Sequence, residues 1–173
     1  YVDDSAYNVA PWFNYSNKPA AVYWAQRNAT TDLISWLDSD ILIASEPSGL
    51  LLESGVDFAA RAEYLPPAIH EGDAKNTPYW QSLCKLIGAN FDELPWISLD
   101  SPVVKMRAFF NSGAFVWRRS SCFAESYVSA FEKLLKSKLA SSSGSAWYAD
   151  QVVISPVLVK HDISWRHLGL VEH

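Results

Sequence analysis

The amino-acid sequence predicts an α/β fold with a mixed, mostly parallel sheet flanked by helices. Short apolar runs at residues 33–37 and 56–60 have the length and composition of buried strands. Residues 121–139 place apolar side chains three and four positions apart, which is the period of an amphipathic helix. Because strands and helices of this kind alternate along the chain, the helices are expected to pack against a sheet.

Local signals predict the remaining elements. A helix is expected over residues 19–28, because Pro19 suits the first turn of a helix and helix-compatible residues follow it. A second helix is expected over 77–86. Residues 103–110 and 114–117 are predicted to be two strands joined by a turn at 111–113. The final helical segment, 146–159, is expected to be interrupted or ended by its proline.

Composition limits the function classes. The 173 residues suit one domain, and the 49% of apolar residues are enough for a hydrophobic core. The net charge of −5 argues against a general nucleic-acid binder, which needs a basic face. No apolar run approaches the roughly 20 residues that cross a bilayer, and the first residues do not have the pattern of a signal peptide. We therefore expect a soluble chain, whose compartment is unknown.

Two carboxylates follow the apolar strand 33–37 directly. Asp38 and Asp40 stand at positions i and i+2, so an extended backbone points both side chains to one face. The carboxyl ends of strands are where open α/β sheets bind ligands. Two acids at one place repel each other unless a cation lies between them, and a hard divalent ion prefers oxygen ligands, some borrowed from a bound diphosphate. The alternative is a pair of solvated turn residues.

Four short segments together resemble the nucleotide-sugar glycosyltransferases of the GT-A fold, and the family 8-like enzymes in particular. Residues 36–43, Trp-Leu-Asp-Ser-Asp-Ile-Leu-Ile, are similar to the Asp-x-Asp (DxD) segment of these enzymes. Asn17-Lys18-Pro19 resembles their lysine-containing helix start. Residues 110–117 resemble their Asn-Ser-Gly segment, and Ala149-Asp150-Gln151 resembles their Asp-Gln pair. The order and spacing of the segments agree with the family over residues 18–151.

The resemblance implies transfer of a sugar from a nucleoside-diphosphate sugar to a hydroxyl of a carbohydrate or other acceptor. It implies Mn²⁺ or Mg²⁺ at the DxD segment, with Asp40 as the direct ligand and Asp38 touching the ribose or sharing the metal. The ion would offset charge on the departing diphosphate.

The same resemblance assigns roles to the other segments. Asn111 and Ser112 would hydrogen-bond the sugar, and Gly113 would allow close approach. Lys18 would contact phosphate. Asp150 or Gln151 would lie at the anomeric carbon, and Asp150 would serve as general base if the reaction inverts configuration. Each segment also has a plainer interpretation as a solvated lysine, a tight turn or a helix surface pair.

Two features depart from this family. Its nucleotide-binding strand–helix–strand unit lies well ahead of the DxD strand, whereas only 32 residues precede Leu33 here. We therefore expect residues 1–173 to form a single, partial glycosyltransferase-like domain, with an exposed sheet edge that favours a homodimer. The second departure concerns the C-terminal histidine segment, which supplies another metal ligand in family 8-like enzymes. No clear match to it is present, and the candidates by position alone are His161, His167 and His173.

Two other functions remain open. A non-catalytic fragment that binds a glycan or a partner would have lost the nucleotide half. A phosphohydrolase would use Asp38 and Asp40 differently, but Ile41 and Leu42 replace the Gly and Thr expected after its second Asp. The aromatic residues near loops, which are candidates for an acceptor groove, are Trp12, Tyr15, Trp96 and Trp165.

Overall fold

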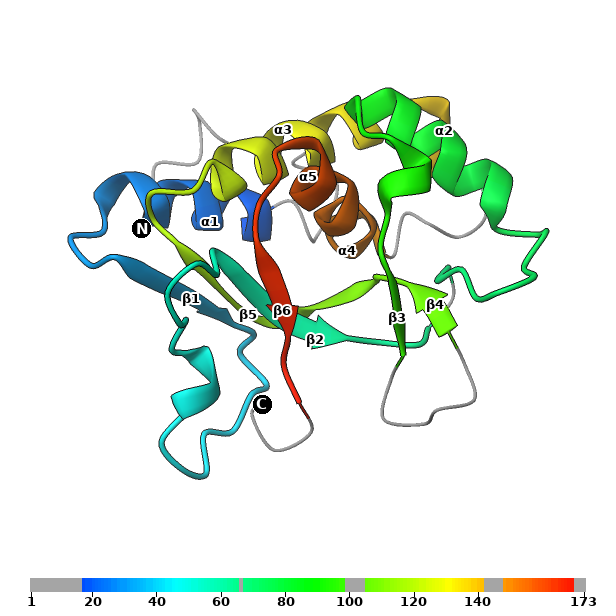
Figure 1. Ribbon diagram of the computed structural model, residues 1–173. Coiled ribbons are helices and arrows are strands. Elements are labelled where there is room, and N and C mark those ends of the chain that lie inside the picture. The colour runs from blue at the N-terminus through cyan, green and yellow to red at the C-terminus, as the bar shows by residue number, and fades with distance from the viewer. Residues whose placement is uncertain (1–16, 66, 99–104, 142–147, 170–173) are drawn as a thin grey trace.

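The structure is a computed structural model that describes residues 17–65, 67–98, 105–141 and 148–169 (Figure 1). Its helices are α1 (Asn17–Asn28), α2 (Thr77–Ile87), α3 (Phe123–Leu135), α4 (Ala149–Val152) and α5 (Ile154–Lys160), with short 3₁₀ turns η2 (Ser48–Leu50), η3 (Phe91–Glu93) and η4 (Lys138–Ser141). Its strands are β1 (Leu33–Leu37), β2 (Phe58–Ala62), β3 (Trp96–Ser98), β4 (Lys105–Arg107), β5 (Phe110–Arg118) and β6 (Trp165–His167). The fold is mixed α/β, as expected.

The main sheet has the order β1-β5-β2-β6, and β3 and β4 form a separate pair. The prediction of a mostly parallel sheet is wrong for these strands. Strand β5 runs antiparallel to both β1 and β2, and only β2 and β6 are parallel. The main sheet is not mostly parallel because β5 lies between β1 and β2 and runs opposite to both. Apolar patterning predicts that a segment is a strand but not the direction in which it runs.

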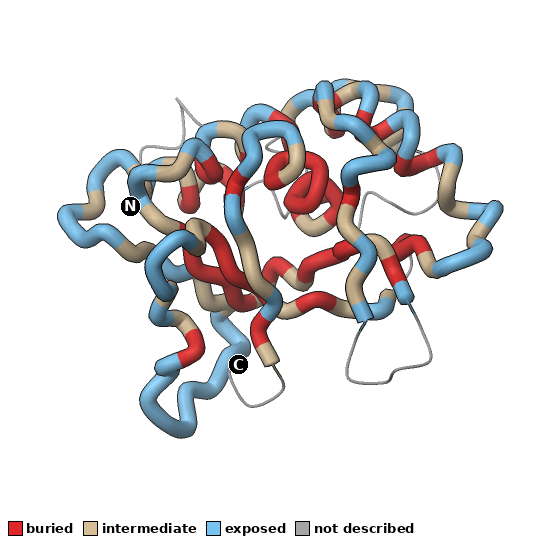
Figure 2. The backbone as a smooth tube through the Cα atoms, in the orientation of Figure 1, coloured by how far each residue is buried: buried red, intermediate tan, exposed pale blue. Residues whose placement is uncertain are grey.

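The helices pack on one face of the sheet (Figure 1). Helices α2 and α3 are amphipathic, and their apolar sides are buried against the sheet and against α5. Aromatic rings fill the centre of this layer. Phe123 of α3 lies 4.6 Å from Phe58 and 5.9 Å from Phe115, measured between ring centroids. Figure 2 shows buried backbone concentrated in β2, β5 and the helix faces above them.

The opposite face of the sheet carries a smaller apolar cluster. Ala59, Val116 and Leu168 are buried there, and Leu50 and Leu52 pack against them. The segment between β1 and β2 covers this face and forms no strand at 41–43, although the apolar Ile-Leu-Ile composition of these residues is typical of a strand. Ile41, Leu42 and Ile43 are exposed instead, because the chain turns at Asp38, where the backbone N–H of Ile41 donates to the Asp38 carbonyl.

Residues 111–113 do not form the expected turn. Strand β5 continues through them, and the register of its pairing with β2 shifts between Ala60 and Ala62. This irregularity lies opposite Asn111, Ser112 and Gly113. A bulge of this kind disrupts the ladder locally and re-aims side chains. The final helical segment is divided into α4 and α5, and Pro156 lies in the first turn of α5, where a proline is tolerated.

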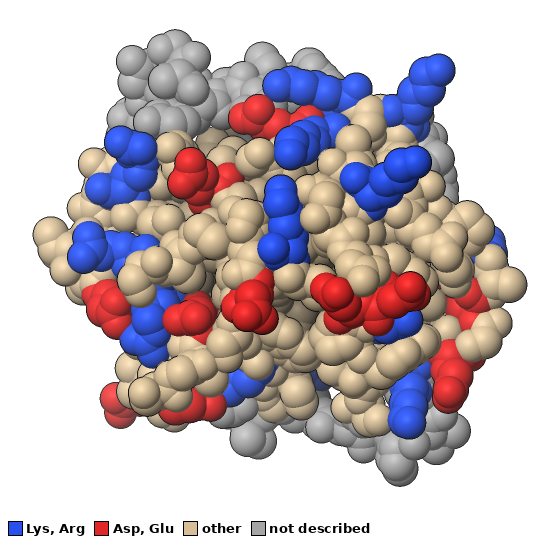
Figure 3. All heavy atoms as spheres, turned by 45° about the horizontal axis from the view of Figure 1, so that its top comes forward, with Lys and Arg blue, Asp and Glu red and all other residues tan. Residues whose placement is uncertain are grey.

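Among the described strands, β1 pairs only with β5, so its outer edge is open as expected, and a homodimer at this edge stays a prediction. None of the described helices combines the length and apolarity that a membrane crossing requires. Figure 3 shows acidic and basic side chains interspersed on the face that it presents, so neither sign of charge covers this face alone.

Replacement of Phe123 by Ala should lower the free energy of unfolding by about 3–5 kcal/mol, because a fully buried ring would leave a cavity among its aromatic neighbours. Urea unfolding followed by circular dichroism measures the change. Glu132→Gln on the same helix is the control. It removes only a surface pair with Lys136 and should change stability by less than about 0.5 kcal/mol. A loss below about 1 kcal/mol for Phe123→Ala would contradict this description of the core.

Candidate functional site

The backbone of β1 and β5 places Asp38 beside Gly113. The antiparallel register puts Leu37 opposite Ala114, and one further hydrogen bond runs from the Asp38 backbone N–H to the Gly113 carbonyl at 2.7 Å. Asp38 therefore lies at the end of β1, next to the bulged part of β5. This pairing brings together the DxD and Asn-Ser-Gly segments, although Asp38 and Gly113 are more than 70 residues apart in the sequence.

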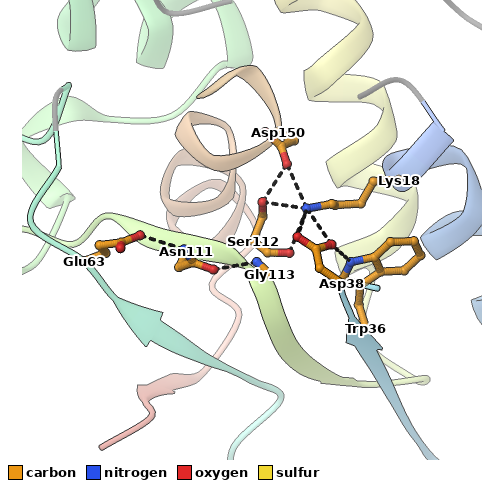
Figure 4. A network of polar contacts seen from close by, with 8 residues as sticks. All are labelled: Lys18, Trp36, Asp38, Glu63, Asn111, Ser112, Gly113 and Asp150. Carbon is orange, nitrogen blue, oxygen red and sulfur yellow. Dashed lines mark hydrogen bonds and ion pairs between the residues drawn. The ribbon is translucent and has the colours of Figure 1, made fainter. Parts of the chain in front are cut away.

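The Lys18 ammonium is the centre of the site (Figure 4). From the first turn of α1, its Nζ atom lies 3.0 and 3.1 Å from the two carboxylate oxygens of Asp38 and 3.2 Å from Oδ2 of Asp150 on α4. It also donates to the hydroxyl and the carbonyl oxygen of Ser112, at 3.0 and 3.1 Å. One cation therefore joins three segments that the sequence predicted separately.

Asp150 is held in an almost closed environment. Its side chain is 4% exposed, and the Ser112 hydroxyl donates to its Oδ2 atom at 2.6 Å. A buried carboxylate requires such partners, because removing a charge from water costs more than one weak contact returns. Ser112 is itself buried, and its hydroxyl accepts from Lys18 while it donates to Asp150.

Trp36 orients Asp38. The two residues are at i and i+2 on one strand and point to the same side, so the indole N–H donates to Oδ1 of Asp38 at 2.6 Å. The Lys18 Nζ atom lies 5.9 Å from the indole ring centroid. The sequence signal for this contact is the position of Trp36 two residues before Asp38.

Glu63 is a site residue that the sequence analysis missed. It follows β2 directly, and its Oε2 atom accepts from the Asn111 amide at 2.7 Å. The amide oxygen of Asn111 in turn accepts from the Gly113 backbone N–H at 2.6 Å. Both contacts fix the orientation of the Asn111 amide. The signal that could have found Glu63 is the one that identified Asp38, namely an acid placed at the end of a predicted strand.

The seven residues Lys18, Asp38, Asn111, Ser112, Gly113, Asp150 and Gln151, together with Tyr148, line a hollow of about 350 Å³, which we name the central hollow. All the predicted site residues except Asp40 are therefore brought together. Asp40 lies two residues beyond Asp38 on an exposed turn and is not part of this lining.

Two polar atoms near the central hollow lack a hydrogen-bond partner within the described part of the chain. They are the hydroxyl of Tyr127, which projects from α3, and Oε1 of Gln151. Burial, together with the negative charges of Asp150 and Asp38, raises the pKa of Tyr127 well above its ordinary value. The hydroxyl therefore remains protonated, adds no negative charge beside the two carboxylates and keeps an O–H that can donate a hydrogen bond.

A divalent ion fits this site only with help from a substrate. Among the described residues, no three His, Cys, Asp or Glu side chains are grouped so that they could hold a metal ion. Asp38 already accepts from Trp36 and Lys18, which leaves Asp40 as the solvent-facing carboxylate of the pair. Two carboxylates completed by diphosphate oxygens are a ligand set that Mn²⁺ or Mg²⁺ accepts.

The histidines proposed by position do not join the central hollow. His161 lines a different hollow beside α3. Its pKa is lowered mainly by burial and, to a smaller extent, by the positive charge of Lys160. His167 pairs with Ala60 in the β2–β6 ladder, and His173 lies outside the described residues.

A strand-end hollow with one shared cation, a buried carboxylate and oriented amide and hydroxyl groups suits the binding of a polar, polyhydroxylated substrate. This α/β fold and site are consistent with a glycosyltransferase, and the class itself is shown by comparison with known families. The family model of the Rhodobacterales glycosyltransferase domain matches residues 4–162, and the chain belongs to this family. No curated protein and no solved structure matches the chain.

Replacement of Lys18 by Met should destabilise the protein by about 3 kcal/mol, because Asp150 would keep its buried charge without the cation. The double variant Lys18→Met with Asp150→Asn should recover a large part of that loss, since the nearly closed Asp150 position is then uncharged, while Asp38 is 33% exposed and still accepts from Trp36. Urea unfolding at neutral pH measures both. Equal stability of the single and the double variant would show that Lys18 does not compensate Asp150.

Replacement of Gly113 by Ala should disturb the site without unfolding the sheet. An added Cβ atom would lie 2.8 Å from Oδ1 of Asn111 and 3.4 Å from Oδ2 of Asp38. Because Glu63 and the Gly113 N–H both hold the Asn111 amide, this side chain cannot move away without losing a hydrogen bond. We expect about tenfold weaker binding of a nucleoside-diphosphate sugar in calorimetry, with an unfolding midpoint close to that of the wild type. Unchanged affinity would contradict the tight packing described here.

Proposed function

We propose that this chain carries the site for transfer of a sugar from a nucleoside-diphosphate sugar to an acceptor hydroxyl. The observation that carries the proposal is the set of contacts from Lys18 to Asp38, Ser112 and Asp150. These residues come from the lysine, DxD, Asn-Ser-Gly and Asp-Gln segments. Because the Lys18 cation contacts residues of the other three segments, the four segments form one site rather than four separate ones.

In this proposal, the central hollow holds the donor sugar and the diphosphate lies toward Asp38 and Asp40. Mn²⁺ or Mg²⁺ would be held by Asp40, with Asp38 contributing to the shell or contacting the ribose, and would supply charge stabilisation of the diphosphate as it leaves. Lys18 adds a second, fixed positive charge. Preorganised charges of this kind stabilise a leaving group without reorganising during the reaction.

The sugar would lie between Asn111 and Asp150. Glu63 and the Gly113 N–H fix the Asn111 amide, so its remaining N–H and lone pair keep a set direction toward sugar hydroxyls. Gln151 offers a buried oxygen that accepts no hydrogen bond within the described residues. Asp150 would act as general base on the acceptor hydroxyl if configuration inverts, and as a positioning group if configuration is retained.

A glycan-binding domain without catalysis is the second candidate. The closed environment of Asp150 favours it, because a base must reach the acceptor hydroxyl, whereas Ser112 and Lys18 both occupy Oδ2 of this carboxylate. In the transferase proposal, the base is the other carboxylate oxygen of Asp150, Oδ1, which neither of these two contacts uses. A phosphohydrolase would instead turn over a generic phosphate ester and require Asp38.

Calorimetric titration with nucleoside-diphosphate sugars, in the presence and absence of Mn²⁺, tests the proposal. We expect binding that the metal strengthens, and a loss of about tenfold or more in Asp38→Asn and in Asp40→Asn, because each removes a charge that the ion or Lys18 requires. Asp162→Asn, at an exposed position with φ of 50°, which Asn tolerates, is the matched control and should bind as the wild type does.

The outcomes separate the candidate functions. Absence of donor binding by the wild type would leave the glycan-binding domain, and phosphatase turnover that Asp38→Asn abolishes would favour the hydrolase. Donor binding that is unchanged in both Asp variants would refute the role assigned to the DxD segment.

A further inference from the structure

A second hollow, of about 270 Å³, lies between the β3–β4 pair and the start of α2. We name it the Trp96 hollow. Its walls include Ile69 and Phe91, and polar side chains of Asp73, Thr77 and Arg107 surround them. Trp96, on the β3 side, is 45% exposed, which is unusual for so large an apolar side chain beside a cavity. No step of the proposed transfer reaction uses these residues.

Trp96 is held rigidly although it is exposed. It stands opposite Arg107 in the β3–β4 ladder, and the guanidinium carbon of Arg107 lies 4.3 Å from the Trp96 ring centroid and 5.2 Å from that of Phe91. The guanidinium also donates to the backbone carbonyls of Asp92, at 3.2 Å, and of Leu94. An aromatic side chain fixed in this way loses little conformational entropy when a ligand stacks on it.

The Trp96 hollow is connected to the central hollow by short stretches of chain. Arg107 and Asn111 are four residues apart, which is about 13 Å in an extended strand. On the β2 side, Tyr64 follows Glu63, which binds Asn111, and the Tyr64 ring lies 6.1 Å from the ring of His70 in the wall of the Trp96 hollow. Figure 1 shows β3 and β4 beside the end of β2 and the start of β5.

The chemistry of this wall suits a neutral sugar chain. Trp96 and Tyr64 are both exposed and present flat apolar faces of the kind that stack on the C–H face of a sugar ring. His70, whose side chain is 44% exposed, supplies a ring nitrogen for hydroxyl groups, and its Nδ1 atom lies 3.6 Å from Oδ2 of Asp73. Arg107 donates from Nη1 to two backbone carbonyls and lies over two rings, although its buried Nε has no hydrogen-bond partner among the described residues, so ring stacking rather than an anion holds this side chain.

We propose that the Trp96 hollow is an acceptor subsite, in which one unit of a neutral oligosaccharide stacks on Trp96 while the end of the chain reaches the central hollow. The role of the bound sugar as acceptor rests on the proposed function, whereas the binding itself does not. Of the other aromatic candidates, Trp165 packs against Phe110 with ring centroids 5.1 Å apart, and Trp12 and Tyr15 lie outside the described residues.

A glycan array that carries neutral oligosaccharides of increasing length tests the subsite. The wild type should bind longer chains better than single sugars. Trp96→Ala should weaken that binding about tenfold, the loss expected for one stacking contact, and Trp96→Phe should retain most of it because a flat ring remains. Trp24→Ala is the matched control, since Trp24 is 42% exposed on α1, far along the chain from β3. Thermal unfolding of each variant verifies that it is folded.

The proposal is overturned if the wild type binds no oligosaccharide on the array, or if Trp96→Ala and Trp24→Ala weaken binding equally. The proposed function fails separately. Binding that depends on Trp96, together with no donor binding and no transfer, would leave a glycan-binding domain with this subsite. Donor binding that depends on Asp38, with oligosaccharide binding unaffected by Trp96→Ala, would retain the transferase and remove the subsite.

Discussion

The Lys18 ammonium is the interaction on which the site depends. It lies within 3.2 Å of oxygen atoms from Asp38, Ser112 and Asp150, and so holds together the start of α1, the end of β1, the bulged part of β5 and the start of α4. Without this cation, two carboxylates would face each other in a largely closed space, which is unfavourable. A diphosphate would be attracted to the same charge, so the group that stabilises the site is also suited to bind the proposed donor.

The sheet provides the frame for this cation. Strand β5 pairs with β1 over residues 114–118, while its register with β2 shifts opposite Asn111, Ser112 and Gly113 near the start of the strand. The three residues therefore leave the regular ladder and gain specific partners in Lys18, Glu63 and Asp38 or Asp150. The irregular pairing lies where ligands would bind, while the aromatic core, formed by rings such as Phe58, Phe115 and Phe123, is fully buried.

Sequence reasoning located most elements because their signals are local. The helices α1, α2 and α3 and the strands β1 and β2 follow from apolar spacing, proline position and the ends of apolar runs. It failed where the signal was not local. The Asn-Ser-Gly triplet is typical of a turn, yet it lies inside β5, where the Gly113 carbonyl accepts from the Asp38 backbone N–H. Ile41–Ile43 has strand composition but no strand to pair with among the described residues.

The sequence by itself determined which chemical groups exist and the order in which they follow one another. Through the resemblance to the GT-A enzymes, this order selected as candidate site residues Lys18, Asp38, Asp40, Asn111, Ser112, Gly113, Asp150 and Gln151. Only the tertiary structure decided that Lys18 contacts both carboxylates, that Glu63 and Trp36 orient their neighbours, and that β5 runs antiparallel to β1 and β2. The physical reason is that composition and spacing act within a few residues, whereas ion pairs and strand direction depend on segments that meet only after the sheet has formed.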